Sequence, residues 1–116
     1  MEANKERLQR IIQESVPGKQ VTLAHVIASP ANEVNERIGV DVGESIGILT
    51  ITPTETAIIA ADIAAKAAAV SIGFVDRFNG SVVILGDVQS VEYSLQEVVD
   101  VFERKLGFSV VKVTKT

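Results

Sequence analysis

The chain has 116 residues, of which 47% are hydrophobic and 22% charged, and its formal net charge is −4. This length suits one domain with a single core. The negative charge and an aromatic content of only 4% argue against a nucleic acid partner. The chain has no cysteine, so a disulfide framework and a thiolate metal site are excluded. No apolar run is long enough for a membrane span, and we expect the excess apolar surface to be buried between subunits.

The first residues are polar and precede the folded domain. The start "MEANKERLQRIIQ" lacks the apolar core of a secretory signal, so we expect a cytoplasmic location. Leu8, Ile11 and Ile12 are spaced as on a helix, and a proline-glycine pair then breaks the pattern. We therefore interpret residues 1–18 as an appendage and residues 19–116 as the domain.

The domain is expected to begin with a strand and a short helix. Residues 20–28, "QVTLAHVIA", are apolar and β-branched, which predicts a strand. Ser29 as N-cap and Pro30 at the first helical position predict a helix over residues 30–38, which Gly39 ends.

A second strand and a helix rich in alanine follow an acidic, glycine-containing loop. Residues 45–52, "SIGILTIT", form a nearly continuous apolar run and predict a strand. The pair Thr52-Pro53 repeats the cap-plus-proline pattern and predicts a helix over residues 54–68.

Two further strands, residues 70–76 and 81–87, are predicted to form a hairpin. The segment "RFNG" joins them, and Asn79 with Gly80 is expected to supply the positive φ angles of the turn.

The last elements are an amphipathic helix from residue 88, ended by Gly107, and a strand over residues 108–116. From residue 45 onward the order is β-α-β-β-α-β, that of the ferredoxin-like fold. The expected fold class is α+β, an antiparallel sheet with both main helices on one face.

Three segments carry a family resemblance: "IIQESVPGKQVTLAHVIASP", "SIGILTITPTETAIIAADIAAKAAAVSIGFVDRFNG" and "VILGDVQSVEYSL". They resemble the circularly permuted shell proteins of bacterial microcompartments, of the type found in ethanolamine- and propanediol-utilisation compartments. The resemblance implies a permuted BMC shell domain in which the usual last strand and helix come first. It also implies a homohexameric structural tile that contacts other shell proteins and encloses a metabolic pathway.

For the N-terminal appendage, the resemblance and the local spacing differ. The resemblance implies that six copies meet at the six-fold axis as a small parallel β-barrel over the pore, whereas the spacing also permits a helix. We expect the barrel, because neighbouring copies can override local propensity. Such a cap would offer a docking surface for cargo enzymes or other shell components. Its residues are Leu8, Arg10, Ile11, Ile12, Gln13, Glu14 and Val16.

The alanine-rich helix carries a narrow polar stripe of Glu55, Asp62 and Lys66. The simpler interpretation is an exposed i, i+4 pair of Asp62 and Lys66, worth a few tenths of a kcal/mol. The resemblance, through a "D-x-x-x-K-A-A-x-V" pattern that ends at Val70, places Asp62, Lys66 and Ala67 at the rim between hexamers.

The hairpin loop "DRFNGS" concentrates polar, aromatic and turn residues. Its turn chemistry alone explains Asn79 and Gly80. The resemblance implies that the loop faces the central pore, where a ring of such loops sets width and charge. The loop residues are Asp76, Arg77, Phe78, Asn79, Gly80 and Ser81.

No residue set in the sequence meets the needs of an active site. His25 is the single histidine, and a lone strand histidine is more often hydrogen-bonded structure than catalyst. "GVDVGES" does not have the spacing of a phosphate-binding loop. We therefore expect no catalysis, no cofactor and no metal. Two alternatives on the same fold remain: a small-molecule-binding regulatory domain, and a small phosphatase-like enzyme, which would need an arginine that "SIGILTITPTE" lacks.

Overall fold

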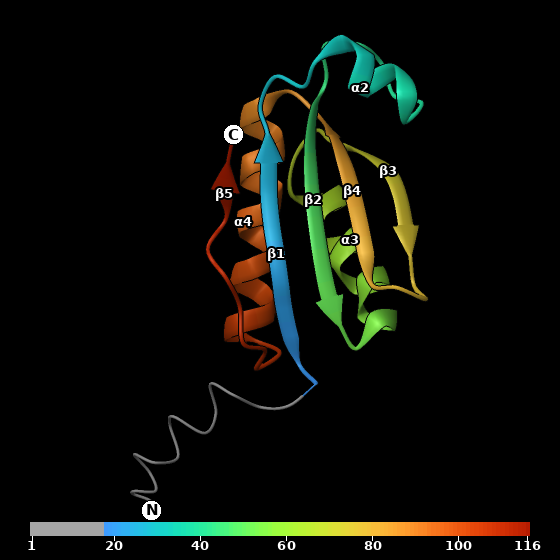
Figure 1. Ribbon diagram of the computed structural model, residues 1–116. Coiled ribbons are helices and arrows are strands. Elements are labelled where there is room, and N and C mark those ends of the chain that lie inside the picture. The colour runs from blue at the N-terminus through green and yellow to red at the C-terminus, as the bar shows by residue number, and fades with distance from the viewer. Residues whose placement is uncertain (1–17) are drawn as a thin grey trace, which may run out of the picture.

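A five-stranded sheet with two long helices on one face forms the fold (Figure 1). The computed structural model describes residues 18–116. In chain order the elements are β1 (Gln20–Ile27), α2 (Asn32–Arg37), β2 (Ser45–Thr52), the 3₁₀ turn η1 (Thr54–Thr56), α3 (Ala57–Ala67), β3 (Ser71–Asp76), β4 (Ser81–Gly86), α4 (Val88–Arg104) and β5 (Thr114–Lys115).

The sheet has the order β3-β4-β2-β1-β5. The pairs β1–β2, β2–β4 and β3–β4 are antiparallel, but β5 runs parallel to β1. The predicted fully antiparallel sheet is therefore wrong in one pair, and the sheet is mixed. The α+β class and the order β-α-β-β-α-β from β2 onward are confirmed. In a ferredoxin-like sheet, β2 and β5 would be antiparallel neighbours. Here β1 lies between them and is antiparallel to β2, so it runs parallel to β5.

The core lies between the sheet and the helix pair α3–α4. The continuous apolar run of β2 places Leu49 and Ile51 on the helix side, where α4 contributes its apolar stripe. A Cβ atom on Gly47 would lie 2.8 Å from side-chain atoms of Ile84 and Val91, so the glycine lets α4 approach the sheet closely. The largest fully buried side chains of the sheet and α4 are Val21, Val26, Leu49, Ile51, Ile84, Val91, Leu95, Val98 and Phe102.

The alanine-rich helix begins later than predicted. Pro53 keeps an extended backbone (φ −67, ψ 147) as the N-cap of η1, so Thr52 does not cap a helix. The Thr56 hydroxyl instead donates to the Pro53 carbonyl oxygen at 2.6 Å. Within α3 the buried residues are alanines, and the Ser94 hydroxyl of α4 donates to the Ala64 carbonyl at 3.1 Å. Small side chains thus bring the two helices together.

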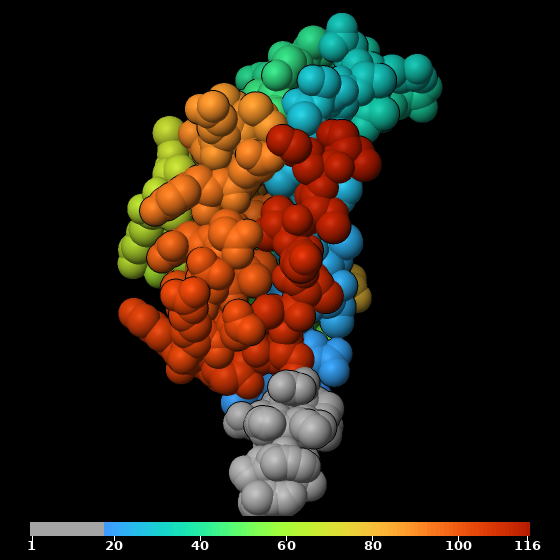
Figure 2. All heavy atoms as spheres, turned by 90° about the vertical axis from the view of Figure 1, so that its left-hand side faces the viewer, coloured from blue at the N-terminus to red at the C-terminus, as the bar shows by residue number. Residues whose placement is uncertain are grey.

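Residues 29–44, which we call the α2 arm, project beyond the sheet. In Figure 2 the arm overhangs the side away from α4. The predicted cap at Ser29 is wrong, because Ala31 occupies the N-cap without a side-chain hydrogen bond, whereas Gly39 ends the helix at φ +79 as expected. Buried Asn35 holds the arm together by donating to the carbonyl oxygens of Asp41 (2.9 Å) and Glu44 (3.2 Å).

The predicted strand over residues 108–116 is largely wrong. Only Thr114–Lys115 forms β5, with a single parallel bridge between Gln20 and Ser109 before it. Val110 and Val113 both pack against the core. Their spacing of three residues does not fit the two-residue period of a strand.

Candidate functional site

The predicted rim residues lie on the exposed side of α3. Lys66 Nζ and Asp62 Oδ2 are 3.0 Å apart, and both side chains are largely exposed. The pair therefore contributes only a few tenths of a kcal/mol to the fold. Ala67 ends the helix beside this pair and is half-buried. The structure brings these residues together at one surface, and their role between hexamers stays a prediction.

The loop between β3 and β4 is organised by Asp76. Its Oδ1 accepts hydrogen bonds from the backbone amides of Phe78 (2.9 Å) and Asn79 (3.0 Å), and its Oδ2 accepts one from Asn79 Nδ2 (2.8 Å). These bonds favour the charged carboxylate, so they lower the pKa of Asp76, with the Asn79 side chain as the largest cause. The loop thus holds a fixed negative charge.

Of the two predicted turn residues, Gly80 has the expected role and Asn79 has a different one. Gly80 has φ +76, but Asn79 does not adopt a positive φ, so that part of the prediction is wrong. Asn79 instead contributes its side chain to Asp76. A Cβ atom on Gly80 would overlap the carbonyl oxygen of Ile51, which shows how closely the loop approaches β2. Ser81, the first residue of β4, pairs with Thr50 of β2.

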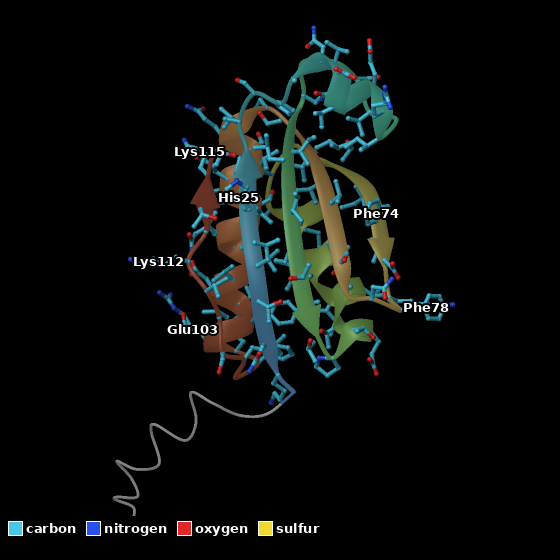
Figure 3. The ribbon with its side chains drawn as sticks, in the orientation of Figure 1. His25, Phe74, Phe78, Glu103, Lys112 and Lys115 are labelled. Carbon is cyan, nitrogen blue, oxygen red and sulfur yellow. The ribbon has the colours of Figure 1, made fainter. Side chains whose placement is uncertain are left out.

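Phe78 is the most exposed large hydrophobic residue of the described chain, at 76%. Figure 3 shows its ring pointing away from the body of the fold. The Arg77 guanidinium lies 4.9 Å from the ring centroid, a cation–π contact that covers one side of the ring. The loop therefore presents an aromatic and a cation outward while Asp76 points back into the turn.

The residues of the predicted cap lie outside the described residues: Leu8, Arg10, Ile11, Ile12, Gln13, Glu14 and Val16. The described chain nevertheless begins at the same end of the sheet as the loop. Gln20 pairs with Thr52, near the end of β2 where Thr50 pairs with Ser81, and Figure 1 shows the start of β1 and the β3–β4 turn at this end.

His25 is hydrogen-bonded within the fold, as predicted for a structural histidine. Its Nδ1 lies 2.6 Å from the Thr114 hydroxyl and its Nε2 lies 2.9 Å from the Thr116 hydroxyl. The ring thereby connects β1 to β5 and leaves no ring nitrogen for a substrate. Within residues 18–116, no cluster of three or more metal-ligating side chains forms, and no helix is long and apolar enough to cross a membrane.

A surface that the sequence interpretation missed is the groove under the α2 arm. It has a volume of about 580 Å³ and is mainly apolar, with Asp41 and Glu44 at its edge. The sequence of β2 could have indicated this surface, because a strand without polar alternation is usually covered on both faces of its sheet. Its apolar lining includes Val34, Ile38, Ile46, Ile48, Phe74 and Leu85.

Comparisons with known proteins agree on one family. The BMC domain family matches residues 45–114. The chain is 60% identical over 110 residues to the bacterial microcompartment shell protein CutR of Streptococcus intermedius, covering 95% of each chain. It is 53% identical over 108 residues to the shell protein PduU of Salmonella typhimurium, covering 92% of this chain and 93% of that one.

The solved structures agree with this assignment. A structure described as "CutR flat hexamer, form 1" superposes with a TM-score of 0.84 at 59% sequence identity, covering 88% of this chain and 94% of that chain. The matched segment holds β2 to α4 and the first residue of β5, with the Asp62–Lys66 pair and the Asp76 loop. The chain thus belongs to the BMC-domain family of bacterial microcompartment shell proteins.

Proposed function

We propose that this chain is a structural tile of a bacterial microcompartment shell and assembles as a homohexamer without catalytic activity. The observation that carries this proposal is its similarity, over nearly its whole length, to a shell protein solved as a flat hexamer. A small-molecule-binding regulator is not favoured, because the relatives described above are shell proteins. The groove and the loop are then surfaces for assembly, with other shell proteins as further partners.

We also propose that the domain, residues 19–116, is circularly permuted. The support is the position of β1, which lies inside the sheet between β2 and β5 although it comes first in the chain. The matched BMC domain begins only at residue 45. Residues 20–37 therefore add a strand and a helix before the matched segment, as permutation requires.

The six Asp76–Ser81 loops are proposed to surround the central pore, with the N-terminal appendage as its cap. Two features support this arrangement: the loop projects from one end of the sheet, and the described chain begins at that same end. Each loop would contribute the charge of Asp76 and the exposed ring of Phe78. Such a ring selects solutes by size and charge.

Light scattering coupled to size-exclusion chromatography tests the tile. The expected mass is six times the chain mass of 12.4 kDa. A monomer at micromolar concentration contradicts the proposal, as does a ligand-stabilised dimer or trimer, which would support a regulator instead.

A further inference from the structure

Asn79 and Gly80, in the loop between β3 and β4, form a pair that is chemically reactive in proteins. In the sequence, Asn79 is the only asparagine that precedes a glycine. In such a pair the backbone nitrogen of the glycine can attack the side-chain carbonyl carbon of the asparagine, because no β-carbon shields that nitrogen. Asn79 is exposed, so water can reach the product of this attack.

The fold requires a glycine at position 80. Gly80 has φ +76, and a Cβ atom there would overlap the carbonyl oxygen of Ile51 and lie 3.2 Å from Cα of Thr54. A side chain at position 80, which would slow the attack by shielding the nitrogen, therefore does not fit the loop. The protection of Asn79 depends on other contacts.

Asp76 holds both reacting groups. Its Oδ2 accepts a hydrogen bond from Asn79 Nδ2 at 2.8 Å, and its Oδ1 accepts one from the Asn79 backbone amide at 3.0 Å. The carbonyl oxygen of Asp76 accepts a hydrogen bond from the Gly80 amide at 2.8 Å. The attack requires the Gly80 nitrogen to lose its proton and the Asn79 side chain to turn toward it, so these bonds oppose the attack. The Asp76 carboxylate also disfavours the negative charge that develops on the Gly80 nitrogen.

We propose that Asn79–Gly80 is a site of spontaneous deamidation, and that Asp76 slows the reaction in the folded chain. First, a bond forms between the Gly80 nitrogen and Asn79 Cγ. The bond between Cγ and Nδ2 breaks, and Nδ2 leaves as ammonia with the amide proton of Gly80. Water then adds to a carbonyl carbon of the resulting succinimide ring and opens it. The product is an aspartate or an isoaspartate at position 79, and water is the only co-reactant.

Either product disrupts the loop. An aspartate at position 79 lacks the Nδ2 donor and places a second carboxylate beside Asp76, so the bond of 2.8 Å is replaced by a repulsion. An isoaspartate adds a carbon atom to the backbone next to Gly80, where the loop already lies against the Ile51 carbonyl. In the proposed hexamer, each conversion adds a negative charge to the ring of loops. The deamidation itself concerns the single chain and does not rest on the hexamer.

Deamidation rates of the intact chain test the site. Each protein is incubated at mildly alkaline pH and digested with trypsin, and mass spectrometry follows fragment 78–104, whose single asparagine is Asn79. The folded chain should deamidate at least about tenfold more slowly than the same chain unfolded in urea, which corresponds to about 1.4 kcal/mol in the barrier. Asp76→Ala, if thermal unfolding shows it to be folded, should deamidate at least about tenfold faster than the unmodified chain. Equal rates in the folded and unfolded unmodified chain overturn the proposal.

The matched control is Asp87→Ala. The Asp87 carboxylate also accepts two hydrogen bonds, from the amide and the hydroxyl of Ser90 at 2.9 Å each, but it caps α4. This variant should keep the slow rate at Asn79. Asp76→Asn, whose amide nitrogen cannot accept a hydrogen bond, replaces Asp76→Ala if the alanine variant does not fold, and it should also deamidate faster at Asn79. An unchanged rate in the folded Asp76 variant, or an equal acceleration in Asp87→Ala, contradicts the role of Asp76.

Discussion

In the loop between β3 and β4, neighbouring residues have separate tasks. The Asp76 carboxylate accepts three hydrogen bonds from Phe78 and Asn79 and fixes the turn. Gly80 provides the positive φ and the close approach to Ile51. Arg77 and Phe78 carry no turn-forming side chain, so they are free to contact other molecules. The sequence correctly predicted a turn with Gly80 at positive φ, but it assigned a positive φ to Asn79 as well. A frequent turn pair does not reveal that the Asn79 side chain bonds to Asp76.

Gly80→Ala should destabilise the fold more than Gly39→Ala. Both glycines have positive φ, which alone costs an alanine about 1 kcal/mol. A Cβ atom at Gly39 meets open space, whereas one at Gly80 overlaps the Ile51 carbonyl oxygen. We expect Gly80→Ala to lower the free energy of unfolding by at least about 1 kcal/mol more than Gly39→Ala does, as measured by urea denaturation. Equal losses would mean that the loop relaxes away from β2.

The hydrogen bonds to Asp76 should make stability depend on acid pH. Its pKa is lower in the folded chain than the ordinary value of 3.8. The carboxylate therefore stabilises the fold fully above that ordinary value and loses this contribution as pH falls through the folded pKa. The free energy of unfolding, measured between about pH 5 and pH 2, should fall less with decreasing pH for Asp76→Asn than for the unmodified chain.

Asn79→Ala should move the pKa of Asp76 back toward its ordinary value in an NMR titration, and an unchanged pKa would contradict the assigned cause.

At the level of elements, the predictions succeeded where the apolar pattern fits one kind of element. β2 matches its predicted range, residues 45–52, and α4 follows its apolar stripe. The caps failed because Ser29 and Thr52 precede prolines that remain outside the helices. The last strand failed because Val110 and Val113 turn toward the core, a tertiary demand that overrides local alternation.

Lys66→Asp should leave the hexamer intact and abolish sheet formation between hexamers. The Lys66 side chain is exposed on α3, and its ion pair with Asp62 contributes little to the fold. The charge reversal places two carboxylates at the proposed contact between two tiles. Light scattering should give an unchanged mass while electron microscopy shows no sheets. Lys105→Asp, at the C-cap of α4, is the control and should still form sheets. Loss of the hexamer in Lys66→Asp would place Lys66 within the hexamer.

For the whole molecule, the sequence predicted the α+β class of the fold, but it missed the groove under the α2 arm. A strand pattern shows that β2 is apolar on both sides without showing what lies on each side. Ile46 of β2 is buried and lines the groove under the α2 arm, while Phe74 on the edge strand β3 is 52% exposed. The position of the arm, which the strand pattern does not show, decides which of these apolar residues are covered.

Deleting residues 1–16 should leave the hexamer assembled and open its axis to solvent. The deleted residues lie outside residues 18–116, whose buried apolar side chains form one core cluster. Light scattering of the truncated protein should still give six chain masses, and its structure should show an open axial channel. An unobstructed channel in the full-length hexamer would show that the appendage is not a cap.

The position of β1 between β2 and β5 has a kinetic consequence. β1 leaves the ribosome well before β5, the strand that pairs with its outer edge, since His25 and Thr114 are 89 residues apart. Closing so long a loop is slow. Until then the outer edge of β1 stays unpaired and can accept the same segment from a neighbouring chain. On a crowded polysome, this gives the C-terminal segment of one nascent chain an opportunity to pair with β1 of another.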